Sequence, residues 1–330
     1  GYDIEQPPPE LDEAAATQIV HDLLGSSDID VEITGTSLWG NNEMYATELS
    51  RGRVFCVGDA VHRHPPSNGL GSNTSIQDSA NLAWKLAAVL RGDAGPSLLD
   101  SYSAERAPVA RQIVTRANRS SREFGGLFEV LGLTSAESER AMIAALEELK
   151  ADSEAGRAKR AALAVELERK NSEFNAHGVE LGQFYESSAV VSDGSGKPSD
   201  GRDPELFFTP GTSPGAPLPH AWVGDQSRRV STLDLAPSTR FTVLTGIAGE
   251  AWAEAAERIA ARTGLPLGAV VIGPGREVSD LYFDWARLRG IEEDGALLVR
   301  PDRIVAFRAP TMVADPERAL AEALDAVLGR

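Results

Sequence analysis

Residues 52–86 carry almost all of the chemistry that this sequence suggests. The length and β-propensity of the apolar run from Arg53 to Val57 favour a buried strand over a helix. Asp59 follows at the carboxyl end of that strand, where the ligands of α/β proteins gather. A carboxylate in this position is suited to accept hydrogen bonds from the hydroxyls of a sugar or polyol.

A glycine-rich loop follows this carboxylate and leads into a strong predicted helix over 74–91. The loop consists of Gly69, Leu70, Gly71, Ser72 and Asn73. Free N–H groups and the positive end of the helix dipole would face a group bound there. Such a site suits an anion, or a ring that becomes anionic during turnover. The glycine pair alone is a weak signal, since a plain turn into a helix needs the same residues. It is not a dinucleotide-binding fingerprint either, because Thr74 occupies the third glycine position.

Three other features of this stretch have simpler interpretations. His62 and His64 precede a Pro-Pro pair in a loop, which fits the helical spacings of zinc enzymes poorly, so we predict no metal site. Trp84 falls on the apolar stripe of the predicted helix and is interpreted as a core residue. Cys56 is interpreted as a small buried hydrophobe rather than a nucleophile.

The elements next to this stretch are read from periodicity. Apolar spacing predicts a helix over 12–26, and alternation predicts strands over 29–38 and 45–49. A second long helix is predicted from about 97 to 124, with Pro108 expected to kink or split it.

The following residues, 135–174, are predicted to be helical and highly charged, with Gly156 as the internal breaker. A solvated helical pair that covers one side of the molecule explains this composition. A coiled-coil partner helix is the alternative, although sustained heptads are lacking.

Residues 193–219 are rich in Gly, Pro, Ser and Asp and are predicted as a linker. The chain beyond them has its own order of elements. The predicted strands are 240–245, 268–272, 295–299 and 304–308, and the helices are 250–263 and 315–328, with a helical turn at 280–287. This order is the plan of a thioredoxin-like α/β sandwich. The predicted fold class is therefore α/β (α+β), with one domain at 1–192 and a thioredoxin-like domain at 220–330.

Composition narrows the class of protein. The 330 residues fit two domains, and 42% hydrophobic with 25% charged residues is ordinary for a globular protein. A net charge of −17 repels phosphate backbones, so no nucleic-acid partner is predicted. The sequence has no apolar run long enough to span a bilayer, no signal peptide, and one cysteine. We therefore expect a cytoplasmic protein without a membrane partner.

The assembled pattern resembles the second flavin-binding motif of the class A FAD-dependent aromatic hydroxylases. The matching residues are RVFCVGDAVH (53–62), Pro65 and Pro66, GLGSN (69–73), DSANLAWKL (78–86) and SYSAERAP (101–108). The wider match resembles the phenol hydroxylase branch and covers nearly the whole chain. It includes GTSLWGNNEMYATEL (35–49), PHAWVGD (219–225) and GALLVRPDRIVAFR (295–308).

The resemblance implies roles for the residues of the motif. Asp59 would bind the ribityl chain of FAD, and Pro65 and Pro66 would line the isoalloxazine face where oxygen reacts. The loop of residues 69–73 would pass beside the pyrimidine ring, where the helix dipole stabilises the anionic reduced flavin. The candidates for the substrate wall are Trp39, Asn42 and Met44.

The resemblance also implies an activity. In enzymes of this kind NADPH reduces FAD, O₂ adds at flavin C4a, and the hydroperoxide delivers OH to the ring carbon ortho to a phenol oxygen. The expected substrate is a phenol, in particular a chlorophenol such as 2,4-dichlorophenol, and the expected assembly is a homodimer. The C-terminal domain has no CxxC motif, so we expect it to be structural.

Two departures from the family pattern leave alternatives open. The sequence has neither the GxGxxG unit that binds the ADP half of FAD nor the internal Asp-Gly motif. We therefore expect a C-terminal portion of a longer hydroxylase, or a chain with a separate N-terminal fragment as its partner. The residue that activates the phenol would lie in that other half. The rival hypotheses are an inactive interaction or oligomerisation module and a polyketide-tailoring hydroxylase.

Overall fold

The computed structural model describes residues 11–226 and 228–330. It divides into two units, up to Asn42 and from Glu43 onward, which are described separately. In the first, α1 (Glu13–Leu24) forms where its apolar spacing predicts, and the Asp12 side chain accepts a hydrogen bond from the Ala15 amide at 2.8 Å. The strand predicted over 29–38 is wrong: the described part of this unit contains no β-strand, so these residues have no strand of their own unit with which to pair.

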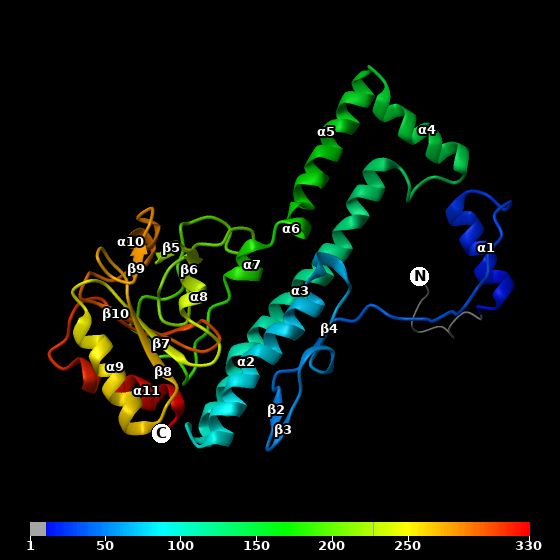
Figure 1. Cartoon of the computed structure of the whole chain (residues 1–330). Coiled ribbons are helices and arrows are strands. Elements are labelled where there is room, and N and C mark those ends of the chain that lie inside the picture. The colour runs from blue at the N-terminus through cyan, green and yellow to red at the C-terminus, as the bar shows by residue number, and fades with distance from the viewer. Residues whose placement is uncertain (1–10, 227) are drawn as a thin grey trace. The chain divides into compact units, whose positions relative to one another are not determined.

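The second unit begins with short strands paired as two small ladders (Figure 1). The antiparallel pairs are β1 (Met44–Tyr45) with β4 (His62–Arg63), and β2 (Ser50–Arg51) with β3 (Val54–Phe55). The predicted buried strand over 53–57 is therefore wrong in length and in burial, because β3 pairs with one described strand and Val54 is 65% exposed. Cys56 is half-buried.

Two long helices follow and form the main support of this unit. The helix α2 (Gly71–Arg91) starts three residues before its predicted position, and Gly92 ends it in the left-handed conformation. A 3₁₀ turn, Pro96–Leu99, leads into α3 (Asp100–Leu131), which continues through Pro108 without splitting. Among the described residues, no helix is both long and apolar enough to cross a bilayer.

The predicted charged helical stretch forms several helices rather than two halves broken at Gly156. They are α4 (Glu139–Lys150), α5 (Glu154–Arg169), α6 (Asn171–Phe174) and α7 (His177–Leu181). The chain turns before Gly156, which lies in the first turn of α5 and donates its N–H to the Ser153 side chain at 3.0 Å. A side chain at Gly156 would overlap the Ala151 carbonyl, so glycine permits the close turn between α4 and α5.

The C-terminal elements form where the sequence predicts them. The strands are β7 (Phe241–Thr245), β8 (Leu267–Val271), β10 (Ala296–Val299) and β11 (Val305–Ala309), and the main helices are α9 (Glu250–Thr263) and α11 (Pro316–Leu328). The sheet order is β11-β10-β7-β8, with β7 and β8 parallel and the other pairs antiparallel. This is the thioredoxin-like topology, and it confirms the predicted fold class.

A second sheet in this region was not predicted. It is three-stranded and antiparallel, in the order β6-β5-β9, and is accompanied by two short helices. Its strands are β5 (Trp222–Asp225), β6 (Arg228–Ser231) and β9 (Val278–Asp280). The helix α8 (Thr232–Leu235) is also new, whereas α10 (Asp284–Leu288) overlaps the helical turn predicted at 280–287. These strands are too short to give a clear alternation.

The largest apolar core joins α2 to the C-terminal sheet. Trp84 and Ala88 from α2 pack with Phe241, Trp252 and Leu298, and the Trp84 and Phe241 rings meet edge to face at 5.7 Å. The interpretation of Trp84 as a core residue is therefore confirmed. The predicted division at residues 193–219 stays a prediction.

Candidate functional site

Asp59 lies in a 3₁₀ turn, Gly58–Ala60, that follows β3. The residue is exposed, and within the described chain its carboxylate makes no ion pair. The turn depends on Gly58, which has a φ of +60° and packs against α2. A side chain at Gly58 would come within 2.7 Å of the Ser75 hydroxyl, so only glycine holds Asp59 this close to the helix.

The glycine-rich loop ends at the N-terminus of α2. The amides of Gly71, Ser72 and Asn73 precede the first N–H that donates within the helix, and no side chain caps this helix. Thr74 is the first residue whose N–H reaches a carbonyl, that of Leu70 at 2.9 Å. The helix therefore presents free donors and its positive end at the loop.

Pro65 is buried and Pro66 is exposed, so the Pro-Pro pair offers one apolar surface next to this loop. His64 lies beside it, with Nδ1 2.7 Å from the Pro65 carbonyl. The two histidine rings, of His62 and His64, stack with their centroids 6.2 Å apart. The part of the chain that the structure describes holds no group of three or more side chains placed to bind a metal. The absence of metal dependence stays a prediction.

A buried carboxylate, Asp78 on α2, fixes the segments around Asp59. It accepts hydrogen bonds from the Gly58 amide at 3.2 Å and the Arg106 Nε at 2.7 Å, and it lies 3.1 Å from His62 Nε2. Burial alone would raise the pKa of Asp78. The hydrogen bond with His62 and the charge of Arg106 outweigh burial and lower that pKa below its ordinary value. Asp78 is therefore held as an anion that joins the two ends of the turn.

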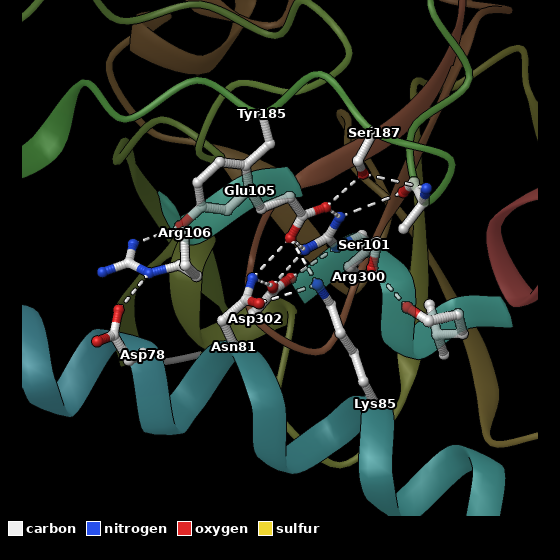
Figure 2. A network of polar contacts seen from close by, with 12 residues as sticks. Asp78, Asn81, Lys85, Ser101, Glu105, Arg106, Tyr185, Ser187, Arg300 and Asp302 are labelled. Carbon is white, nitrogen blue, oxygen red and sulfur yellow. Dashed lines mark hydrogen bonds and ion pairs between the residues drawn. The ribbon is translucent and has the colours of Figure 1, made fainter. Parts of the chain in front are cut away.

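A second buried cluster surrounds Glu105, the residue before Arg106 on α3 (Figure 2). Its carboxylate pairs with Lys85 Nζ at 2.7 Å and with both terminal nitrogens of Arg300, at 2.6 and 2.9 Å. Burial opposes its charge, but these two cations lower the pKa of Glu105 well below its ordinary value. Burial and the neighbouring Arg300 lower the pKa of Lys85 to about 8.

The candidates for the substrate wall are divided between the two units. Trp39 and Asn42 belong to the first unit, and Met44 lies in β1 of the second. Trp39 and Met44 are exposed. The Asn42 side chain donates to the Gly40 carbonyl at 2.9 Å. Their common role stays a prediction.

Sequence reasoning gave no role to the buried charges, although the matching motifs contain most of them. Figure 2 shows Asp78, Asn81 and Lys85 on one helix, pointing toward Glu105, Arg106 and Arg300. The available signal was the presence of charged residues on the inward face of two predicted helices, where unpaired charges are costly. Their partner Arg300 lies 195 positions away from Glu105 in the sequence, and no local pattern links the two.

These residues fit a flavin. An exposed carboxylate without an ion pair suits a polyol chain, and the free amides at the α2 N-terminus suit a ring that becomes anionic. One buried polar atom of the site, His62 Nδ1, has no partner among the described residues. FAD carries both a ribityl chain and such a ring.

Comparison with known proteins identifies two families. A family profile described as "FAD binding domain" matches residues 1–117, and one described as "Aromatic-ring hydroxylase, C-terminal" matches residues 211–330. Phenol 2-monooxygenase of Pseudomonas sp. (strain EST1001) is 56% identical over 98% of this chain and 53% of its own length. The 2,4-dichlorophenol 6-monooxygenase of Delftia acidovorans is 54% identical over 94% of this chain and 53% of its own length. The chain thus spans about half the length of these curated relatives.

Solved structures give the same result. The flavin-dependent monooxygenase PieE, in complex with FAD and substrate, superposes with a TM-score of 0.89 at 45% identity, over 98% of this chain and 56% of PieE. Aklavinone-11 hydroxylase, in a ternary complex with FAD and aklavinone, superposes with a TM-score of 0.75 at 30% identity. That match covers 100% of this chain and 54% of the hydroxylase.

Proposed function

Because this chain belongs to the FAD-dependent aromatic-ring hydroxylases, we propose that it serves the NADPH- and O₂-dependent hydroxylation of a phenol, ortho to the phenol oxygen. The observation that carries the proposal is that one short stretch of the chain holds both the exposed Asp59 carboxylate and the uncapped N-terminus of α2. The sequence of this chain is 56% identical to that of a phenol 2-monooxygenase.

The residues of the loop bind and orient the cofactor in this proposal. Asp59 accepts hydrogen bonds from the ribityl hydroxyls, and Pro65 and Pro66 lie against the ring. The backbone amides of residues 69–73 face the pyrimidine edge and stabilise negative charge there by fixed polarity. Bound FAD supplies the electron transfer from NADPH and the activation of O₂. The protein holds the ring in place and excludes water from it.

The substrate class is part of the same proposal. We expect a chlorophenol such as 2,4-dichlorophenol to be hydroxylated, with Trp39, Asn42 and Met44 contributing to the wall of its pocket. A polycyclic phenol is the second candidate, because aklavinone-11 hydroxylase, solved with aklavinone, superposes on this chain. We further propose that residues 1–192 and 220–330 are separate domains. We also propose that the protein is a homodimer, and sedimentation would test this assembly.

The test uses the protein as its gene encodes it. The purified protein is expected to bind FAD, seen as a visible absorbance spectrum, and to consume NADPH when a phenol is added. With ¹⁸O₂, mass spectrometry is expected to find one labelled oxygen in a catechol product. A panel of phenol, 2,4-dichlorophenol and a polycyclic phenol ranks the substrates by kcat/KM. A colourless protein that FAD cannot reconstitute would instead support a catalytically inactive interaction module.

A further inference from the structure

We propose that Arg300, in the C-terminal thioredoxin-like region, is a positioning residue for the flavin-binding segments at 58–62 and 71–74. It would act through Glu105 and Arg106 of α3. The proposal rests on the proposed function for the identity of the cofactor. It assigns to the C-terminal region a part in shaping the flavin site without contact with the flavin.

The first link joins the C-terminal sheet to α3. Arg300 follows β10, is 0% exposed, and forms a two-point ion pair with Glu105, Nη1 to Oε1 at 2.6 Å and Nη2 to Oε2 at 2.9 Å. Asp302 accepts a hydrogen bond from Arg300 Nε at 2.9 Å. A forked pair of this kind fixes orientation as well as distance, because both planar groups must align.

The second link joins the same carboxylate to α2. Glu105 Oε2 accepts from Asn81 Nδ2 at 2.7 Å and from Lys85 Nζ at 2.7 Å. Asn81 Nδ2 also lies 3.2 Å from Asp302 Oδ2, so the β10–β11 turn contacts α2 directly. The position of Arg300 therefore bears on how α2 and α3 are held together, through Asn81 and Lys85. These two residues lie within one to three helical turns of Thr74 and Asp78 on the same helix.

The third link carries the constraint to the loop. Arg106 donates to Asp78 Oδ1 at 2.7 Å and to the Thr74 carbonyl, in the first turn of α2, at 3.3 Å. Asp78 in turn holds the Gly58 amide and His62. The two segments proposed to bind the flavin are thus both anchored to Arg106, which is covalently adjacent to Glu105.

The segment of residues 183–187 connects the two clusters a second time. Arg106 Nη1 donates to the Tyr185 hydroxyl at 2.8 Å and to Gln183 Oε1 at 2.5 Å. Ser187 donates to Glu105 Oε1 at 2.6 Å. Because Glu105, Arg106 and Arg300 are buried, removing one charged partner leaves an uncompensated charge, and the cluster must rearrange rather than be solvated. Rearrangement at Arg300 is therefore expected to reach the loop.

The test is amide hydrogen exchange, followed by mass spectrometry, on the protein as its gene encodes it, freed of cofactor. Arg300→Met is expected to speed exchange in peptides covering 57–64 and 70–76 by about tenfold. The matched control is Arg258→Met, which removes an exposed ion pair with Glu317 in the same region and is expected to leave both peptides unchanged. If Arg300→Met speeds exchange only near β10 and β11, the proposal is overturned. If that variant does not fold, Arg300→Lys decides, since it keeps the charge and loses the fork.

A second measurement separates this proposal from the proposed function. In the protein as its gene encodes it, Arg300→Met is expected to weaken FAD binding about tenfold and to shift the visible flavin spectrum, whereas Arg258→Met changes neither. A wild-type protein that binds no FAD would contradict the proposed function and leave the exchange result standing. A wild-type protein that binds FAD, together with a folded Arg300→Met variant of equal affinity and spectrum, would overturn the positioning role alone.

Discussion

The motif region (residues 43–91) and the C-terminal region (residues 211–330) differ in the side chains that their buried positions hold. In the C-terminal region β7 and β10 are buried at every residue. In the motif region neither β1 nor β3 has a buried residue, and Ile76 and Leu90 on α2 are exposed. The buried positions of α2 include an aspartate, an asparagine and a lysine.

This difference shows that buried charges add to apolar packing in the region proposed to carry the chemistry, whereas the central strands of its neighbour are held by apolar packing. Apolar packing tolerates small changes of position, because dispersion and hydrophobic contacts are not directional. A buried ion pair loses most of its value when its geometry is disturbed. We therefore expect the motif region to respond sharply to single changes of charge and the C-terminal region to respond to changes of volume.

The largest effect is expected for Glu105→Ala. This change removes the partner of two buried cations, Lys85 and Arg300, and the free energy of unfolding should fall by about 3–5 kcal/mol. Urea denaturation measures it. Glu317→Ala removes a carboxylate whose partners, Arg258 and Arg262, are exposed, and it should leave the midpoint unchanged. Equal effects of the two changes would contradict the comparison.

The next effect tests apolar packing in both regions. Leu298 is 1% exposed in the C-terminal core, so Leu298→Ala should cost about 3 kcal/mol of unfolding free energy. Leu90 on α2 is 83% exposed, and Leu90→Ala should change stability by about 0.5 kcal/mol or less. The substitution is the same at both sites, which differ in burial and in secondary structure. A large loss from Leu90→Ala would show that the chain itself covers this face of α2 in solution.

The same contrast explains which parts of the structure could be predicted from the sequence. The predicted thioredoxin-like order is confirmed, because strands such as 296–299 bury continuous apolar runs that are visible locally. The buried strand predicted over 53–57 is wrong, because burial depends on neighbours that its own residues do not specify. The sequence also did not reveal the Glu105–Arg300 pair, since geometry brings together residues far apart in the chain.

A smaller effect concerns pH and Lys85. Burial, together with the positive charge of Arg300, disfavours the charged form of Lys85, so the folded protein releases the Lys85 proton near its lowered pKa of about 8. The unfolded chain keeps the proton up to the ordinary pKa of 10.5. Between these values the unfolded state binds more protons, so the free energy of unfolding contributed by this group rises with pH, by roughly 3 kcal/mol at most.

Denaturation of the wild type and of Lys85→Met across this pH range isolates the contribution of the lysine. The difference in unfolding free energy between the two proteins should shift in favour of the wild type as the pH increases from 8 to 10.5. Parallel profiles would mean that Lys85 titrates as it does in the unfolded chain, and that the cluster is open to water.

The smallest expected effect on stability, and the most direct test of the site, is Asp59→Ala. This residue is exposed and makes no ion pair within the described chain, so the variant should unfold at the wild-type urea midpoint. If its carboxylate accepts a ribityl hydroxyl, a charge-assisted bond of about 1.5–3 kcal/mol is lost, and FAD binding should weaken by about 10- to 100-fold. Quenching of flavin fluorescence, in the protein as its gene encodes it, measures the affinity for FAD.

Glu322→Ala, which removes an exposed carboxylate on α11, is the control and should bind FAD as the wild type does. Unchanged affinity in Asp59→Ala would remove this carboxylate from the site. A loss of stability would mean that the motif region depends on its exposed charges as well as its buried ones.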